Sequence, residues 1–186
     1  MSQGKKPKPM SDRSFNLMVW TFKLTDLFFR PRRHLNKVPL GEGMVVVDYA
    51  CGPGRYTIPL AEIVGPKGKV FAIDIQPMAI KTVKEKAAQR SLSNIEAILV
   101  DSYHTGIPNS SADIVLLIDA LHSIMDYDAL FHEIHRLLRP YGFLFLEPGH
   151  MRASKATQIV KDTGLFTLTD RRGRDMLLTK KLKVEE

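Results

Sequence analysis

The sequence predicts an α/β fold built on a doubly wound, mostly parallel sheet with an antiparallel hairpin at its C-terminal end. Three observations support this prediction. After Pro39, short apolar runs alternate regularly with helical stretches. Residues 44–57 read as an apolar strand, a glycine-containing turn and a helix start. Near the end, two apolar-rich runs are joined by the polar segment 170–173, which is a hairpin signal.

Each element follows from the spacing of apolar residues and turn formers. Five parallel strands are expected, at 44–48, 69–74, 95–100, 112–118 and 142–147. Helices are expected between them, at 54–64, 77–89, 127–138 and about 151–161. The runs 164–169 and 174–179 form the expected antiparallel pair.

The N-terminal part has a different composition. Residues 1–10 predict a flexible basic tail, 11–40 a helical extension or lid, and 41–186 the cofactor-binding domain. The aromatic-rich stretch 11–30 predicts an amphipathic helix that ends near Pro31, and its charged residues argue against a transmembrane span. It serves either as a helix docked on the domain or as a peripheral membrane contact through 11–33.

Composition and charge narrow the class of protein. Hydrophobic residues make up 44% and charged residues 25%, which is typical of a soluble globular domain. Residues 1–40 carry nine Lys/Arg and two acids, so the basic ends either attract nucleic acid, anionic lipid or an acidic substrate, or are simply solvated. The single cysteine, Cys51, excludes a disulfide framework, and with no signal-peptide pattern the expected location is cytoplasmic.

The segment 44–57 predicts a site for a nucleoside cofactor. A strand that runs into a glycine turn brings bare backbone close to a ligand. Asp48 lies directly before the turn, and Thr57 replaces the third glycine of a dinucleotide fingerprint. A pyrophosphate is disfavoured beside that carboxylate, whereas S-adenosylmethionine has no phosphate and carries a sulfonium and an ammonium group.

Acidic residues end every one of the five expected parallel strands. They are Asp48, Asp74, Asp101, Asp119 and Glu147. Because the carboxyl ends of parallel strands meet at one edge of a sheet, these side chains are expected to gather where ligands bind.

Chemistry suggests a role for each residue near that edge. Asp74 is placed to accept both ribose hydroxyls, and Ile75 to cover one face of the adenine. Asp101 accepts from the adenine amino group, while the backbone N–H of Ser102 reads a ring nitrogen. The backbone of Ala50 and Gly52 approaches the methionine part, and Asp119 lies on its ammonium side.

These motifs resemble the class I S-adenosylmethionine-dependent methyltransferases over about residues 40–180, most nearly the small ubiquinone/menaquinone-type enzymes. The matching segments are Val-Val-Asp-Tyr-Ala-Cys-Gly-Pro-Gly at 46–54, Val-Phe-Ala-Ile-Asp at 70–74, Val-Asp-Ser at 100–102, Ala-Asp-Ile-Val-Leu-Leu-Ile-Asp at 112–119 and Leu-Leu-Arg-Pro-Tyr-Gly-Phe-Leu at 137–144.

The resemblance implies the family's seven-stranded, Rossmann-like methyltransferase fold. It also implies S-adenosylmethionine as cofactor, with roles in its binding for Asp48, Gly52, Gly54, Asp74, Asp101 and Asp119. The chain departs from the family pattern at Ala50, where the family usually has glycine, and this methyl group is expected to weaken cofactor binding. Tyr141 also replaces a frequent glycine, in a turn where the change is expected to be neutral.

Methyl transfer needs an acceptor held on the axis of displacement, and a general base is optional. His122 is the candidate catalytic residue, with Glu147, His150 and Tyr103 near the same edge. His132 and His135 share a predicted helix with Glu133 but lack a further ligand, so no metal site is expected.

The acceptor itself is not encoded in a recognisable motif. The aromatic N-terminal segment favours a small apolar or aromatic molecule, such as a quinone or lipid, while its Lys and Arg residues permit a nucleic acid. Three alternatives stay open: a methyltransferase acting on nucleic acid, a non-catalytic S-adenosylmethionine-binding module, and a nicotinamide-dependent oxidoreductase. The sequence does not predict an oligomeric state.

Overall fold

Strands and helices alternate along most of the chain in this computed structural model, which describes residues 8–25 and 31–182. Contacts among the residues divide the chain into two units. Of the described residues, those from 8 to 101 form one unit and those from 102 to 182 form the other.

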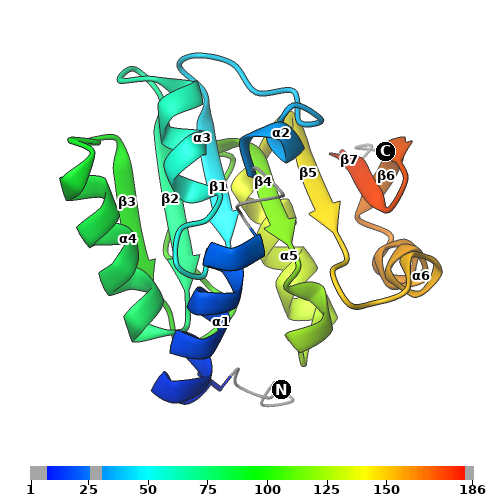
Figure 1. Ribbon diagram of the computed structural model, residues 1–186. Helices are drawn as coiled ribbons and strands as arrows, with labels where there is room; N and C mark the ends of the chain where they lie inside the picture. The colour runs from blue at the N-terminus through cyan, green and yellow to red at the C-terminus, as the bar shows by residue number, and fades with distance from the viewer. Residues whose placement is uncertain (1–7, 26–30, 183–186) are drawn as a thin grey trace. The chain divides into compact units, whose positions relative to one another are not determined.

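The first unit contains three parallel strands in the order β3-β2-β1. They are β1 (Val45–Tyr49), β2 (Lys69–Asp74) and β3 (Ile95–Leu99), with Val46 opposite Val70 and Val70 opposite Ile95. The helices α3 (Thr57–Val64) and α4 (Pro77–Gln89) lie side by side on one face of these strands (Figure 1). Apart from the partly exposed Val45, the apolar side chains of β1 and β2 are buried, as expected of parallel strands.

Two helices precede the first strand. Helix α1 (Asp12–Thr25) buries Phe15, and the short helix α2 (Pro31–Leu35) buries Leu35. Pro31, near which the first helix was expected to end, begins α2. A proline is well suited to the first position of a helix, where its missing N–H has no partner to lose. Residues 26–30 of the predicted helix lie outside the described residues.

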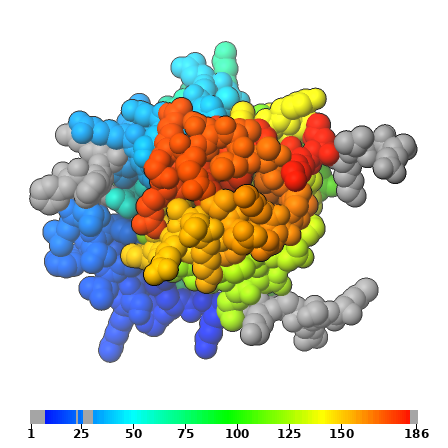
Figure 2. Space-filling view, turned by 90° about the vertical axis from the view of Figure 1, so that its right-hand side faces the viewer, coloured from blue at the N-terminus to red at the C-terminus, as the bar shows by residue number. Residues whose placement is uncertain are grey.

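The second unit joins a parallel strand pair to an antiparallel hairpin. Its strands are β4 (Ala112–Ile118), β5 (Leu138–Glu147), β6 (Phe166–Arg172) and β7 (Asp175–Lys180), in the order β4-β5-β7-β6. The β4–β5 pair is parallel and the other two pairs are antiparallel. Its helices are η1 (Leu121–Ser123), α5 (Tyr127–Leu137) and α6 (Ala153–Thr163). Helix α6 and strand β6 form much of the surface in Figure 2.

Two details of this unit differ from the prediction. Strand β5 begins at Leu138 rather than at 142, and it reaches Phe143 through a bulge in which Tyr141 has a φ of 66°. The hairpin turn is two residues long, because Arg172 pairs with Asp175, and Gly173 supplies the positive φ of 66° that such a turn requires. The predicted seven-stranded, mostly parallel sheet with an antiparallel C-terminal hairpin is confirmed.

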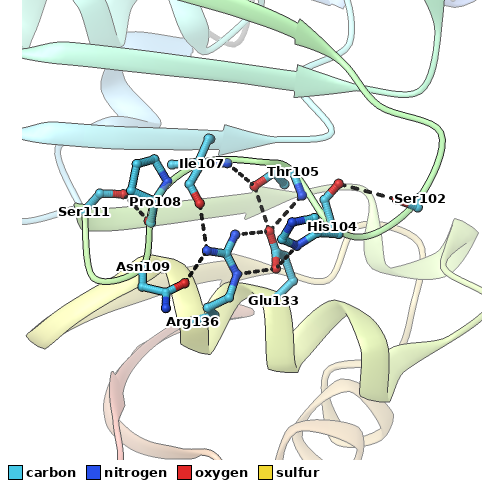
Figure 3. Close-up of polar contacts among 9 residues, drawn as sticks. All are labelled: Ser102, His104, Thr105, Ile107, Pro108, Asn109, Ser111, Glu133 and Arg136. Atoms are coloured by element: carbon cyan, nitrogen blue, oxygen red, sulfur yellow. Dashed lines mark hydrogen bonds and ion pairs between the residues drawn. The ribbon is translucent and has the colours of Figure 1, made fainter.

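A buried carboxylate fastens the loop that precedes β4 to helix α5. Glu133 accepts hydrogen bonds from the backbone N–H and the hydroxyl of Thr105, at 2.8 and 2.7 Å, and from the guanidinium of Arg136 (Figure 3). Arg136 also donates to the carbonyl oxygen of Ile107 and to Asn109. These hydrogen bonds lower the pKa of Glu133 from 4.5 to about 2 despite its burial.

We therefore expect Glu133→Gln to destabilise the protein by about 2 kcal/mol at neutral pH. The ionised form is favoured in the folded state, so this contribution is complete above about pH 4.5 and is lost as the pH falls toward 2. Urea unfolding at several pH values measures it, and the exposed Glu85→Gln, which removes a surface pair with Lys81, is the control. A destabilisation that is the same at every pH contradicts the account.

Candidate cofactor site

The turn after β1 repeatedly adopts the left-handed backbone conformation. Ala50, Gly52 and Gly54 have φ values of 60°, 52° and 76°. The turn is closed by hydrogen bonds from the Cys51 N–H to the Ile73 carbonyl at 2.9 Å and from the Gly54 N–H to the Cys51 carbonyl at 3.1 Å. The helix expected from residue 54 accordingly starts at Thr57, after this turn.

The two glycines of the turn are needed for different reasons. A Cβ atom at Gly54 would lie 2.9 Å from a methyl group of Val83, so glycine allows helix α4 to pack closely there. A Cβ atom at Gly52 would meet no described atom within 4 Å. The backbone at Gly52 therefore faces space in which a ligand can approach.

Asp74, at the end of β2, is oriented by the backbone around it. Its Oδ2 accepts from the Gly52 N–H and its Oδ1 from the Gln76 N–H, both at 2.8 Å. Each oxygen keeps a further lone pair, so the carboxylate can still accept two hydroxyl donors. Burial raises the pKa of Asp74, and the two backbone hydrogen bonds oppose that rise.

Asp48, at the end of β1, lies under the turn. It is 3% exposed, and its Oδ2 accepts a 2.6 Å hydrogen bond from the hydroxyl of Thr57. Burial raises the pKa of Asp48 from 3.8 to about 7, with a smaller contribution from the negative charge of Asp74. The Thr57 partnership escaped the sequence analysis, although Thr57 had been noted at the third glycine position.

The residues after β2 and β3 complete this unit's part of the site. Ile75 is partly buried, and Asp101 is the exposed last residue of the unit. The following Gln76 is buried, and its Oε1 has no hydrogen-bond partner among the described residues. Gln76 was not among the site residues predicted from the sequence. Its position directly after Asp74 and Ile75 is the only feature of the sequence that could have indicated a place in the site.

Helix α1, which precedes β1 in the chain, contacts two residues of the candidate site. The Phe22 ring lies 5.0 Å from the guanidinium carbon of Arg55, in the turn, and the Gln76 side-chain amide donates to Asp12 at 3.5 Å. The opposite face of α1 is apolar and exposed. Its residues Leu17, Trp20 and Leu24 are 64%, 58% and 45% exposed.

These features fit S-adenosylmethionine. The fixed carboxylate of Asp74 suits ribose hydroxyls, the open backbone at Gly52 suits close approach, and Gln76 Oε1 can still accept a hydrogen bond. The carboxylate of Asp74 favours a cationic ligand over a phosphorylated one, because a phosphate group beside it would bring two negative charges together.

The second unit contains the other predicted residues. Asp119 follows β4 and Glu147 ends β5, and the Asp119 N–H donates to the Glu147 carbonyl at 3.0 Å. His122 lies in η1 and His150 follows β5. The structure thus brings Asp119, His122 and His150 together, with side-chain separations of 3.8 and 3.9 Å to Asp119.

Two further candidates lie in the loop after β3. The Ser102 hydroxyl donates to the His104 carbonyl at 3.4 Å. The Tyr103 hydroxyl, a candidate for proton transfer, accepts from the backbone N–H groups of Met125 and Asp126, both at 3.1 Å. Tyr103 therefore ties this loop to the N-cap of helix α5.

The two histidines of helix α5 contact backbone carbonyl groups. His132 and His135 contact the backbone carbonyls of Asp128 and Lys181, both at 2.9 Å. Across residues 8–25 and 31–182, no group of three His, Cys, Asp or Glu side chains is arranged to hold a metal ion. In the same residues, no helix is both long and apolar enough to cross a membrane.

The left-handed conformation of Ala50 leads to a prediction. We expect Ala50→Gly to stabilise the protein by about 1 kcal/mol, because a φ of 60° costs alanine more than glycine. Thermal unfolding measures it. Ala88→Gly, at an exposed position in the last turn of helix α4, is the control and is expected to destabilise by up to about 1 kcal/mol. Loss of stability in both variants would show that the turn does not strain Ala50.

Comparisons with known proteins agree with this geometry. A family model described as a methyltransferase domain matches residues 40–170. The demethylmenaquinone methyltransferase of Geobacillus stearothermophilus is 32% identical over 118 residues, which cover 60% of this chain and 50% of that protein. The chain thus spans about half the length of the curated relatives it matches.

Solved structures show the same fold. A proposed S-adenosyl-L-methionine-dependent methyltransferase from Methanococcus maripaludis superposes with a TM-score of 0.79 at 16% identity, over 100% of this chain and 99% of that one. A SAM-dependent methyltransferase from Aquifex aeolicus gives a TM-score of 0.71 at 24% identity, over 81% and 88% of the two chains. The match to the family model covers well over half of the sequence, and the chain belongs to the class I S-adenosylmethionine-dependent methyltransferase family.

Proposed function

We propose that this protein uses S-adenosylmethionine to methylate a small apolar or aromatic acceptor of the quinone type. The observation that carries the proposal is the pairing of the Gly52 backbone with the Asp74 carboxylate, which prepares a position for the ribose of the cofactor. When bound, S-adenosylmethionine supplies a methyl group on a positively charged sulfur. The protein then has to hold the acceptor in line and exclude water.

The quinone-type acceptor is supported by the curated relatives, which are demethylmenaquinone methyltransferases. It is also supported by the exposed apolar side chains of α1, which lie on the face opposite to the one that contacts the turn at Arg55. A nucleic-acid acceptor is supported only by the formal net charge of the chain, which is +7.

The direct experiment incubates the full chain with S-adenosylmethionine and a demethylated naphthoquinone in its reduced and oxidised forms. We expect S-adenosylhomocysteine to be released only when an acceptor is present. RNA and DNA serve as the competing acceptors. If S-adenosylmethionine binds but no acceptor is methylated, the non-catalytic alternative replaces this proposal; methylation of nucleic acid alone replaces the acceptor class.

A lipophilic acceptor leads us to propose that α1 also contacts anionic membrane surfaces. Leu17, Trp20 and Leu24 project from one face of the helix together with Arg13, and Arg32 and Arg33 follow in α2. Trp20 is the only tryptophan, so its fluorescence reports this face alone. We expect its emission to shift to shorter wavelength with phosphatidylglycerol vesicles and less with phosphatidylcholine vesicles.

The double variant Leu17→Gln, Leu24→Gln is expected to weaken vesicle binding at least about tenfold, because it removes two apolar side chains that would be buried. Lys84→Gln, on an exposed position of α4, is the control. Emission that stays unchanged with both kinds of vesicle would contradict the membrane contact.

A further inference from the structure

An acid and two histidines form a cluster at the carboxyl ends of β4 and β5. The acid–histidine cluster consists of Asp119, His122 and His150. Asp119 Oδ1 lies 3.8 Å from His122 Nδ1 and 3.9 Å from His150 Nε2. The two imidazole rings meet edge to face, with centroids 5.2 Å apart. All three residues belong to the same unit of the chain.

The backbone holds the carboxylate of this cluster in place. Asp119 has a φ of 51°, an uncommon conformation for a residue other than glycine, and its N–H is bound to the Glu147 carbonyl. A Cβ atom at Gly149 would overlap the Asp119 carboxylate, so only glycine lets the turn that carries His150 approach this closely. Arg174, in the turn between β6 and β7, donates to the carbonyl oxygens of Gly149 and Met151 and fixes the turn that carries His150.

The carboxylate lacks a hydrogen-bond donor where it faces the histidines. Asp119 Oδ1 is buried and has no hydrogen-bond partner among the described residues. A buried carboxylate oxygen without a donor is unfavourable, and a small rotation of either imidazole would bring an N–H to it. An imidazole N–H of His122 or His150 can therefore complete the hydrogen bonding of Asp119.

His122 is the better placed of the two histidines. Its Nδ1 faces Asp119, which leaves Nε2 to meet a substrate, and its side chain is 40% exposed. The side chain of His150 is 82% exposed and presents Nε2 to the acid. An acid that orients one ring nitrogen while the other takes a proton is the arrangement of a general base.

We propose that His122 Nε2 removes a proton from the methyl acceptor, that Asp119 is the positioning residue for this histidine, and that His150 passes the proton on to solvent. The inference rests on the proposed function, and it defines the acceptor as a phenol or enol whose hydroxyl is protonated in solution. As the carbon–sulfur bond breaks, its electron pair stays on sulfur. The acceptor's oxygen, or its conjugated carbon, forms the new bond to the methyl group, and the hydroxyl proton moves to His122. When carbon is methylated, the ketone formed then loses the proton on that carbon, and its oxygen regains a proton, which restores the conjugated hydroxyl compound.

The test compares two acceptors that differ in acidity. The probes are naphthol, which is protonated at about pH 8, and nitronaphthol, which is ionised there and needs no base. We expect His122→Gln to lower the rate with naphthol at least about 100-fold and the rate with nitronaphthol less than about fivefold. Asp119→Asn is expected to lower the rate with naphthol about tenfold and to affect the rate with nitronaphthol less. His150→Gln is expected to lower the rate with naphthol by a smaller factor than Asp119→Asn does.

A second measurement does not depend on turnover. Ionised nitronaphthol is coloured, so visible absorbance reports its proton loss in the presence of the cofactor-free protein. We expect the wild-type protein to raise the ionised fraction at a pH where free nitronaphthol is partly protonated, and His122→Gln not to. Thermal unfolding of each variant, and S-adenosylmethionine binding by the His122 and His150 variants, establish that the fold and the cofactor site are intact. The rates of Asp119→Asn are compared at saturating S-adenosylmethionine, because Asp119 also has a predicted role in binding the cofactor.

The outcomes separate this inference from the proposed function. Equal rate losses with both acceptors, or an ionised fraction that does not depend on His122, would overturn the proton-accepting role while leaving methylation intact. If the wild-type protein methylates neither probe, the absorbance measurement alone decides the role of His122. If S-adenosylmethionine itself does not bind, it is the proposed function that fails.

Discussion

Asp74→Ala is expected to weaken S-adenosylmethionine binding by about 100-fold or more. Two ribose hydroxyls donating to one carboxylate form charge-assisted hydrogen bonds, each contributing about 1.5–3 kcal/mol. Loss of both corresponds to a factor of 100 or more in the dissociation constant. The variant also releases the Gly52 N–H, whose 2.8 Å hydrogen bond to Asp74 holds the turn in the conformation that meets the ligand.

Isothermal titration calorimetry measures this effect. The control is Asp113→Ala, which removes an acid that pairs with Arg139 at 2.5 Å and carries no predicted cofactor role. We expect the control to bind S-adenosylmethionine as the wild type does. An unchanged dissociation constant in Asp74→Ala would remove the ribose assignment, whereas an equal loss in both variants would point to general electrostatic attraction.

Asp48→Asn is expected to stabilise the protein at alkaline pH. The folded-state pKa of Asp48 is about 7, well above its ordinary value of 3.8, so the folded state holds a proton that the unfolded state has lost. Stability therefore falls as the pH rises from about 4 to 7 and stays low above that range. A shift of this size corresponds to roughly 4 kcal/mol. The asparagine side chain keeps an oxygen for the Thr57 hydroxyl and removes the pH dependence.

Urea unfolding between about pH 4 and pH 9 measures this prediction. The two proteins should differ least near pH 4 and most above pH 8. Glu133→Gln provides a control of opposite sign, since its effect is present at neutral pH and disappears in acid. If Asp48→Asn destabilises the protein equally at every pH, the carboxylate is ionised in the folded state and the account of its environment is wrong.

The sequence predicted the fold well because the signals for parallel strands are local. Long apolar runs, glycine turns and acids at strand ends all lie within a few residues of one another, and β2, α4 and β4 begin and end where predicted. The predicted methyltransferase family is confirmed by the match over residues 40–170. Errors occurred at boundaries set by backbone conformation: the helix expected from residue 54 starts at Thr57, after the left-handed residues of the turn.

Contacts between distant segments could not be predicted from local patterns. Glu133 looked like a helix-surface acid, yet it binds the backbone of Thr105, 28 positions earlier. Gly149 gave no signal that it leaves room for the carboxylate of Asp119. The hydrogen bond between Thr57 and Asp48 joins residues that are close in the sequence, and so it was easier to predict. Thr57 begins α3, after the turn that follows the strand of Asp48.

The roles assigned to individual cofactor-site residues stay predictions. The structure places Asp48, Ala50, Gly52, Gly54 and Asp74 around one turn of the first unit, as the spacing suggested. Ile75 and Asp101 follow the neighbouring strands of that unit, and Ser102 and Asp119 belong to the second. Calorimetric titration of S-adenosylmethionine into a variant of each residue would test these roles.

The most direct test of the central claim is calorimetric titration of the full chain with S-adenosylmethionine, S-adenosylhomocysteine and NAD. We expect saturable binding of the two sulfur nucleosides at micromolar to submillimolar concentration and none of NAD, because the Asp74 carboxylate at the end of β2 disfavours a pyrophosphate. Binding of NAD in preference to S-adenosylmethionine, or no heat with either sulfur nucleoside at millimolar concentration, would contradict it.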